Sequence, residues 1–255
     1  MKVIAIANQK GGVAKTTTTH NLGVALAAQG KRVLMIDLDS QASLTISVGL
    51  EPLEVEQTIV DVLRKEGLPL MECVQRLSDR LHIVTSIIDL APMEMELLSR
   101  ASREKILDRA LRPVREQYDF ILIDCPPSLN ILTINALTAA DTVLVPIQCE
   151  YYALEGLNQV LKTVELVKRK LNPQLELEGV VFTMYDARTN LSLQVVESVK
   201  NNLNQTIYKT IIPRNVRLAE APSHGMSINL YDTRSTGAES YRMLAAEVMS
   251  RGEEL

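Results

Sequence analysis

The stretch Asn-Gln-Lys-Gly-Gly-Val-Ala-Lys-Thr-Thr, residues 8–17, decides the fold of this chain. It follows a short apolar run at residues 3–7 and leads into residues 16–29, whose apolar side chains recur at helical spacing and stop before Gly30. A glycine-containing loop between a strand and a helix N-terminus binds phosphate, because backbone N–H groups and the positive end of the helix attract anionic oxygens. The sequence therefore predicts a phosphate-binding loop at its first strand–helix junction.

Further short runs, rich in Val and Ile, are apolar at every position rather than at alternate positions. Such strands are covered on both faces, which is typical of a parallel sheet. These runs lie at residues 33–37, 81–84, 120–123, 142–147, 179–184 and 207–212. Helical spacing of apolar residues returns at residues 154–171, 189–203 and 235–250. The alternation predicts a doubly wound α/β fold with a mostly parallel sheet flanked by helices.

Length and composition bound the class of protein. A chain of 255 residues that is 46% hydrophobic suits a single domain over residues 1–255. Because the first strand begins within three residues of the N-terminus, we expect no N-terminal DNA-binding accessory domain. The net charge of -4 requires any nucleic-acid contact to come from a local patch. No CxxC pair and no long apolar run occur in the sequence, which favours a cytoplasmic protein with reduced thiols.

The loop departs from the strict GxxxxGK[ST] pattern, because Gln9 and Ala14 occupy both glycine positions. It matches instead the deviant Walker A form KGGxxK[ST], with an additional lysine at Lys10. Lys15 would reach the β- and γ-phosphates, and the Thr16 hydroxyl would bind Mg²⁺. Ala14 adds a methyl group where the backbone closes on phosphate, so we expect it to adopt a negative φ and to leave ATP binding intact.

Acidic residues end two of the predicted strands. Asp37 and Asp39 lie two residues apart in Leu-Met-Ile-Asp-Leu-Asp-Ser-Gln, residues 34–41, so both project from one side at the carboxyl edge where α/β proteins bind ligands. Asp124 ends an apolar strand in the general Walker B form, and we expect it to support Mg²⁺ through water. An apolar strand before Asp is common in α/β proteins, and it gains weight here because the loop and the first acidic segment precede it.

In this order the segments resemble the ParA/MinD superfamily of P-loop NTPases. The sequence Asp-Cys-Pro-Pro-Ser-Leu at residues 124–129 resembles that of the chromosomal ParA (Soj) family in particular. The similarity continues at residues 145–156, 183–190, 212–217 and 220–225, and so spans nearly the whole chain. The resemblance implies a slow ATPase that uses ATP and Mg²⁺ as cofactors and dimerises around two sandwiched nucleotides.

The resemblance also implies roles for individual residues. Lys10 reaches the ATP of the partner subunit, Asp39 orients or activates the hydrolytic water, and Asp37 helps to hold the Mg²⁺ shell. Lys10, Lys15 and Asp39 are then the catalytic residues. The expected metal set is Thr16, Asp37 and Asp124, and the expected nucleotide-binding set is Lys10, Gly11, Gly12, Val13, Ala14, Lys15, Thr16, Thr17, Pro213 and Asn215. Pro213 and Asn215 would lie near the adenine, although both are also ordinary turn residues.

Two kinds of partner follow from the resemblance. Chromosomal ParA proteins bind nonspecific double-stranded DNA as ATP dimers, and Arg188 and Arg217 occupy matching positions. A surface arginine can equally be solvated or ion-paired. A ParB-like partner would stimulate hydrolysis, and the cycle would drive chromosome or plasmid segregation on the nucleoid. We expect no stable membrane association.

Three alternatives stay open. The first is ParA-like positioning of another cargo, which this sequence does not separate from chromosome partition. The second, a MinD-like membrane ATPase, needs a basic amphipathic C-terminal helix, whereas the acidic end at residues 251–255 would be repelled by anionic lipid. The apolar stripe Tyr241, Leu244, Ala245 and Val248 therefore predicts a helix docked on the core. The third is an ATP-dependent amide ligase, for which the sequence shows no substrate pocket.

Cysteine and histidine positions add little chemistry. An iron–sulfur site at Cys125 and Cys149 is conceivable from their places at strand ends, but buried thiols fit better because cluster-ligand surroundings are missing from the sequence. We interpret His20 and His82 as packing residues and assign no role to His224.

Overall fold

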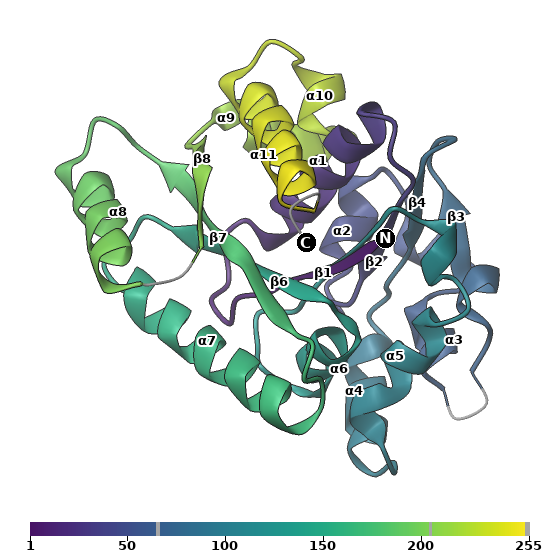
Figure 1. Cartoon of the computed structure of the whole chain (residues 1–255). Helices are drawn as coiled ribbons and strands as arrows, with labels where there is room; N and C mark the ends of the chain where they lie inside the picture. The colour runs from purple at the N-terminus through teal and green to yellow at the C-terminus, as the bar shows by residue number, and fades with distance from the viewer. Residues whose placement is uncertain (65–66, 204–205, 253–255) are drawn as a thin grey trace.

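The computed structural model describes residues 1–64, 67–203 and 206–252. At its centre is an eight-stranded sheet in the order β3-β4-β2-β5-β1-β6-β7-β8 (Figure 1). Only the β3–β4 pair within this sheet is antiparallel. The strands are β1 Lys2–Ile6, β2 Val33–Asp37, β3 Val74–Arg76, β4 Leu81–Val84, β5 Phe120–Asp124, β6 Thr142–Gln148, β7 Glu176–Tyr185 and β8 Ile207–Pro213.

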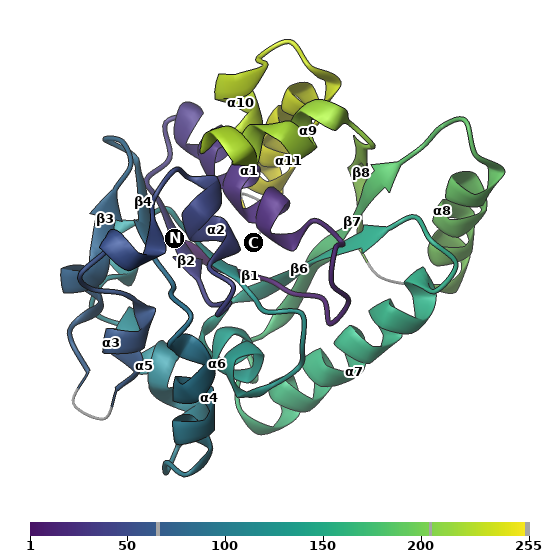
Figure 2. The same cartoon turned by 180° about the vertical axis from the view of Figure 1, so that it is seen from behind.

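Helices cover both faces of the sheet, as Figures 1 and 2 show from opposite sides. One layer contains α1 Lys15–Ala28, α2 Ser43–Ser47, α9 Val216–Glu220, α10 Ile228–Tyr231 and α11 Thr236–Gly252. The other contains α3 Ile59–Leu63, α4 Leu90–Leu98, α5 Ile106–Leu111, α6 Ile131–Ala139, α7 Ala153–Lys170 and α8 Asn190–Asn202. Short 3₁₀ helices lie at Pro52–Glu54, Leu70–Cys73, Arg103–Lys105, Arg115–Gln117 and Ala221–His224. The predicted doubly wound architecture is confirmed.

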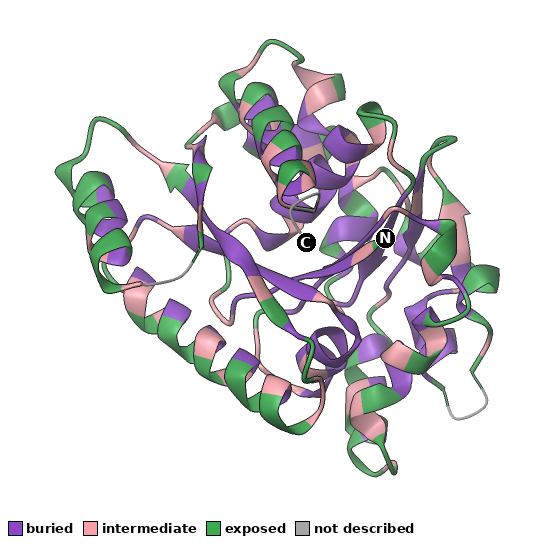
Figure 3. Ribbon diagram, in the orientation of Figure 1, coloured by how far each residue is buried: buried purple, intermediate pink, exposed green. Residues whose placement is uncertain are grey.

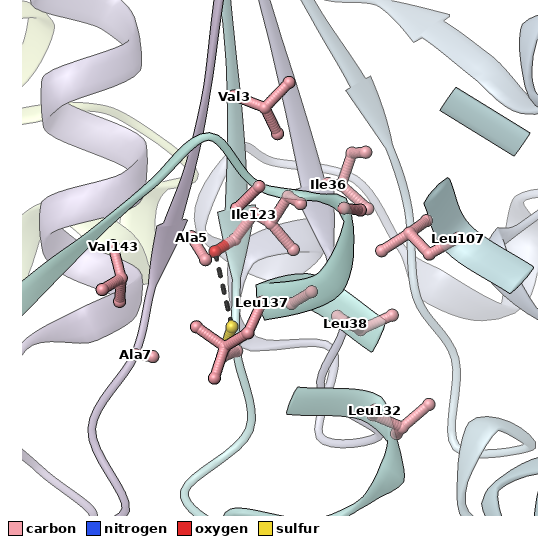
Figure 4. Close-up of a cluster of buried hydrophobic side chains, with 14 of the residues drawn as sticks. Val3, Ala5, Ala7, Ile36, Leu38, Leu107, Ile123, Leu132, Leu137 and Val143 are labelled. Carbon is pink, nitrogen blue, oxygen red and sulfur yellow. Dashed lines mark hydrogen bonds between the residues drawn. The ribbon is translucent and has the colours of Figure 1, made fainter. Parts of the chain in front are cut away.

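Two hydrophobic clusters, one on each face of the sheet, explain why the strands are apolar at every position. In β1, Val3 and Ala5 belong to the cluster beneath α3–α8, whereas Ile4 and Ile6 belong to the cluster beneath α1 and α11. Figure 4 shows part of the first cluster, where Val3 is grouped with Leu137 of α6. Fully burying one such aliphatic side chain contributes about 1.5–3 kcal/mol to the stability of the fold. Because each strand buries side chains on both faces, helices on both sides stabilise it.

The C-terminal helix is docked on the core, as its apolar stripe predicts. Tyr241, Leu244, Ala245 and Val248 are all fully buried, and α11 packs on α1 and β8 (Figure 3). Residues 253–255 of the acidic end lie outside the described residues. Within the described ranges, no helix combines the length and apolarity needed to cross a membrane.

The sequence-based boundaries are accurate to a few residues for the long elements. The strands at residues 33–37 and 81–84 match β2 and β4 as predicted, and α1 begins at Lys15, one residue before the predicted start. The antiparallel strand β3 and the short helices α4, α5 and α6 were not individually predicted. Strand β3 is only three residues long, so a period-two pattern has no room to appear.

Candidate nucleotide site

The carboxyl ends of β2, β5 and β1 meet at one edge of the sheet. These three strands are neighbours, and Asp37 of β2 is the register partner of Asp124 of β5. The loop of residues 7–14 leaves β1 at the same edge and enters α1. Parallel topology therefore brings together the three segments that the sequence singled out.

The loop contains two residues in the left-handed region, Gly12 with φ 73° and Ala14 with φ 67°. The expectation of a negative φ at Ala14 is therefore wrong. Ala14 is the N-cap of α1, and its carbonyl already accepts a hydrogen bond from the Thr18 backbone N–H at 2.9 Å. The Thr183 hydroxyl donates to the Val13 carbonyl at 3.1 Å and anchors the loop from β7. With these contacts in place Ala14 has the left-handed geometry, which costs a non-glycine residue about 1–2 kcal/mol.

Lys15 is folded back beneath the loop. Its ammonium group donates to the Lys10 carbonyl at 3.1 Å, and the residue is only 7% exposed. Burial lowers the pKa of Lys15, and the nearby Asp124 carboxylate partly opposes that shift. Lys15 lines a cavity of about 370 Å³ together with Gly11, Gly12, Thr16 and Asp39. A cation beside glycine N–H groups in a small concave site is suited to bind phosphate oxygens.

Asp124 and Thr16 are brought together as the sequence predicts. The Thr16 hydroxyl donates to Asp124 Oδ2 at 2.7 Å, and the Thr19 hydroxyl donates to Oδ1 at 3.2 Å. Burial raises the pKa of Asp124 to about 8, and the neighbouring Asp37 adds to that shift. Two buried carboxylates side by side disfavour ionisation, which a divalent cation would relieve. The hard oxygen donors of Thr16 and Asp124 fit Mg²⁺, which keeps several waters and phosphate oxygens in its shell.

Asp37 binds protein donors with both oxygens. Its Oδ2 accepts hydrogen bonds from the Thr45 backbone N–H at 2.9 Å and from the Thr45 hydroxyl at 2.8 Å. Its Oδ1 accepts from the Asp39 backbone N–H at 3.2 Å. Burial raises the pKa of Asp37 to about 6 despite these hydrogen bonds. Its expected place in the Mg²⁺ shell stays a prediction.

Lys10 forms an ion pair with Glu150 of the same chain, and both side chains are partly exposed. Lys10 also lines a cavity of about 360 Å³ with Gln9, Pro127 and Tyr152. Lys10 does not line the cavity around Lys15. Any contact of Lys10 with a nucleotide in another subunit requires the Glu150 pair to open.

A second cavity of about 370 Å³ adjoins the phosphate cavity and shares Ala14, Thr17 and Met184 with it. Pro213 and Asn215 line this second cavity, and their contact with adenine stays a prediction. Met184, which was not predicted, lines both cavities and has a left-handed φ of 50°. Its position next to the carboxyl end of β7 was the available signal, since ligands bind at that edge.

Asn215 is also the N-cap of α9. Its Oδ1 accepts from the backbone N–H groups of Arg217 at 2.8 Å and Leu218 at 3.3 Å, and its amide donates to the Thr236 hydroxyl at 2.9 Å. Most of its hydrogen-bonding capacity is therefore used within the protein. The turn interpretation and the adenine interpretation of Asn215 both fit its position.

The two arginines proposed for DNA are exposed, and each is ion-paired within the chain. The Arg188 guanidinium group donates two hydrogen bonds to Asp186, at 2.9 and 2.7 Å, with 86% of its side chain exposed. Arg217 pairs with Glu220 at 3.0 Å. A phosphate contact would have to compete with these carboxylates.

Of the remaining candidates, the two cysteines and His20 are buried, whereas His224 is exposed. Cys125 and Cys149 are buried free thiols, and burial raises the pKa of Cys149 to about 11. His20 is 4% exposed and its Nδ1 lies 3.2 Å from the Ser47 hydroxyl, while His224 stacks on Tyr231 with ring centroids 5.0 Å apart. No cluster of three His, Cys, Asp or Glu side chains suited to a metal occurs in the part of the chain that the structure describes.

Comparison with known proteins identifies the family. A family model described as an AAA domain matches residues 1–177. The sporulation initiation inhibitor protein Soj of Bacillus subtilis is 55% identical over 251 residues, with 98% of this chain and 99% of that protein covered. The chromosome partitioning protein ParA of Caulobacter vibrioides is 48% identical over 253 residues, with 98% and 95% covered. Among solved structures, cobyrinic acid a,c-diamide synthase from Mycobacterium smegmatis, with bound ATP analogue and magnesium, superposes with a TM-score of 0.88 at 39% identity, covering 99% of this chain and 96% of that one. The chain belongs to the ParA/Soj family of chromosome-partitioning ATPases.

Proposed function

We propose that this chain is a Mg²⁺-dependent ATPase that dimerises around two ATP molecules and binds nonspecific DNA in that state. Hydrolysis, stimulated by a ParB-like protein, then releases the DNA, and the cycle drives chromosome or plasmid segregation by a cytoplasmic, nucleoid-associated protein. The observation that carries the proposal is the pair of adjoining cavities, with Lys15, Thr16 and Asp124 at one end and Pro213 at the other. Charged groups at one end would face the phosphates of a nucleoside triphosphate, and the cavity at the other end would hold its base.

The roles of the residues follow from their contacts. Lys15 would hold the β- and γ-phosphates, and Thr16 with Asp124 would hold Mg²⁺, which neutralises the charge that develops on the phosphate oxygens. Asp39 is partly exposed at the cavity rim, where its carboxylate can orient a water molecule. An ordinary carboxylate has a pKa near 4 and is a weak base at neutral pH, so positioning supplies most of the rate and turnover is slow.

Dimerisation would exchange one partner of Lys10 for another. In this monomer Glu150 holds the ammonium group, and in the dimer the phosphates of the other subunit's ATP would take its place. Lys10 would bind the γ-phosphate, which ADP lacks, so ATP would favour the exchange where ADP would not. The two nucleotide states would thereby differ in dimer stability.

DNA contact would similarly draw Arg188 and Arg217 from their own carboxylates to phosphates of the duplex. The opposing carboxylates keep the affinity of each monomer low. A dimer presents two copies of each arginine, and about four phosphate contacts imply a log–log salt slope of about -3.6. We therefore expect weak binding that depends on ATP and falls steeply with salt.

The test is binding to nonspecific duplex DNA with ATP and with ADP over a salt series, using wild type and an Asp39→Ala variant expected to stall hydrolysis. ATP-dependent, salt-sensitive binding that persists in the variant supports the proposal and leaves only the cargo open. Intact ATP binding without DNA binding in either nucleotide state would contradict the proposed role in DNA segregation.

The second candidate, an ATP-dependent amide ligase, draws on the diamide synthase of the 39% identical structure. The shallow cavity beside Lys10 adjoins the phosphate loop, but it measures only about 360 Å³. Incubation with ATP, an amide donor and cobyrinic acid would separate the candidates, since a ligase forms amide product and a partition ATPase releases only ADP and phosphate. The MinD-like alternative is disfavoured because the apolar stripe of α11 is buried in the core.

A further inference from the structure

The Asp37 carboxylate is a junction between two segments of the site. Its Oδ2 accepts two hydrogen bonds from Thr45 in α2, and its Oδ1 accepts one from the Asp39 backbone N–H. Asp37 and Thr45 are both fully buried, whereas Asp39 is partly exposed at the cavity. The orientation of the Asp37 carboxylate therefore connects the position of α2 to the backbone of Asp39.

The hydroxyl of Thr45 has a defined direction. It accepts a hydrogen bond from the Ser86 backbone N–H at 3.0 Å and lies 2.8 Å from Asp37 Oδ2, to which it donates. Ser86 is also fully buried and follows β4, the neighbour of β2. A chain of hydrogen bonds thus runs from Ser86 through Thr45 and Asp37 to Asp39. A valine at position 45 would leave the Ser86 N–H without its partner and Asp37 with one donor fewer.

The far end of α2 is anchored independently. The Ser47 hydroxyl lies 3.2 Å from His20 Nδ1 of α1. Beyond α2, Gly49 packs against Gly225, with φ values of 85° and 63°, so closely that a Cβ on Gly225 would lie 2.6 Å from the Gly49 Cα. The five-residue helix is therefore held by α1 and by the Ala221–His224 turn, and it supplies a fixed reference for Thr45.

We infer that Thr45 is a positioning residue for ATP hydrolysis: from the fixed helix α2 it orients the Asp37 carboxylate, which in turn holds the Asp39 backbone. The inference rests on the proposed role of Asp39 in orienting water. It extends the hydrolytic machinery to a side chain that lines neither cavity, and it explains why α2 follows directly after the acidic segment.

The experiment compares Thr45→Val, which keeps shape but removes the hydroxyl, with Thr45→Ser, which keeps the hydroxyl. Loss of a hydrogen bond to a charged group predicts a kcat about tenfold lower in Thr45→Val, while the Kd for AMPPNP with Mg²⁺ stays within about threefold of wild type. Thr45→Ser should restore kcat to within about threefold. The control is Thr138→Val, because Thr138 is a buried threonine whose hydroxyl bonds only the Ile134 carbonyl of its own helix α6. This control should leave kcat and Kd unchanged.

A second variant tests the anchor at a distance from Asp37. Gly225→Ala forces Gly49 to move and should reproduce the split between lowered kcat and retained Kd, although residue 225 lines neither nucleotide cavity. The positioning role is wrong if Thr45→Val lowers affinity as much as kcat, if Thr45→Ser fails to restore kcat, or if Gly225→Ala leaves kcat at the wild-type value.

Amide hydrogen exchange separates a failure of this inference from a failure of the proposed function. The Asp39 N–H should exchange about tenfold faster in Thr45→Val than in wild type, a change that is measurable without nucleotide or turnover. Unchanged exchange at Asp39 overturns the positioning role even where the protein hydrolyses ATP. Faster exchange in a protein without ATPase activity would support the Asp37 junction and reject the proposed function instead.

Discussion

The phosphate end and the adenine end of the site are built differently. At the phosphate end, Lys15 follows the loop after β1, and Asp37 and Asp124 end β2 and β5. These side chains are buried and hydrogen-bonded, Lys15 to the loop, Asp124 to α1 and Asp37 to α2. At the adenine end, residues from β7, β8 and α11 form a cavity in which Asn215 is occupied with capping α9. The proposed phosphate end offers charge and local backbone geometry, whereas the proposed adenine end offers mainly shape.

The largest expected effect tests the charge at the phosphate end. Lys15→Ala should weaken ATP binding about 100-fold, because a buried charge-assisted contact contributes up to about 3 kcal/mol. Isothermal titration with AMPPNP and Mg²⁺ measures the change. Lys200→Ala, at an exposed lysine of α8, is the control and should bind as wild type does. Retained affinity in Lys15→Ala would contradict a binding site in which the Lys15 charge dominates at the phosphate end.

The pH dependence of stability tests the buried His20, which lines the cavity at the phosphate end and not the cavity at the adenine end. Burial lowers the pKa of His20 to about 4, against 6.5 in the unfolded chain, so the unfolded state binds the proton more readily. Stability is fully present above pH 6.5 and declines as the pH falls toward 4, by about 3 kcal/mol for this group. Urea denaturation of wild type and His20→Asn between pH 7.5 and 4 measures the difference in slope. Equal slopes in the two proteins would show that His20 titrates normally when folded.

The strain at Ala14 should be recoverable. Ala14→Gly should raise the free energy of unfolding by about 1 kcal/mol, because glycine adopts φ 67° without the steric cost that alanine bears. Ala27→Gly, within α1, is the matched control and should lower it by about 1 kcal/mol. The same sign in both variants, in denaturant melts, would contradict the strained geometry.

The smallest effect concerns Asn215. Asn215→Ala should lower the free energy of unfolding by about 1 kcal/mol through loss of the α9 cap and should weaken ATP binding less than about threefold. Asn215→Asp retains the cap and should restore stability. A loss of ATP affinity above tenfold in Asn215→Asp, with stability intact, would show that the adenine end binds through polar contacts of residue 215 rather than through the shape of the cavity.

Most of the phosphate end could be predicted, because its signals are local. The loop at residues 8–17 is a contiguous motif between a strand and a helix. Asp37 and Asp124 each end an apolar strand, and parallel topology brings the carboxyl ends of these strands to the same edge of the sheet. The adenine end was predicted only through family resemblance at Pro213 and Asn215. Met184 was missed because its place in both cavities depends on how β7 lies against the loop.

The sequence by itself determined the doubly wound architecture, the phosphate loop and the acidic strand ends, since apolar runs and glycine loops act through chemistry within a few neighbouring residues. Only the tertiary structure decided the left-handed φ of Ala14, the pairing of Lys10 with Glu150 and the engagement of Asp37 with Thr45. Each of these features depends on how separate segments pack, which a local sequence pattern does not indicate. Packing between distant elements selects one of several conformations that the local sequence allows.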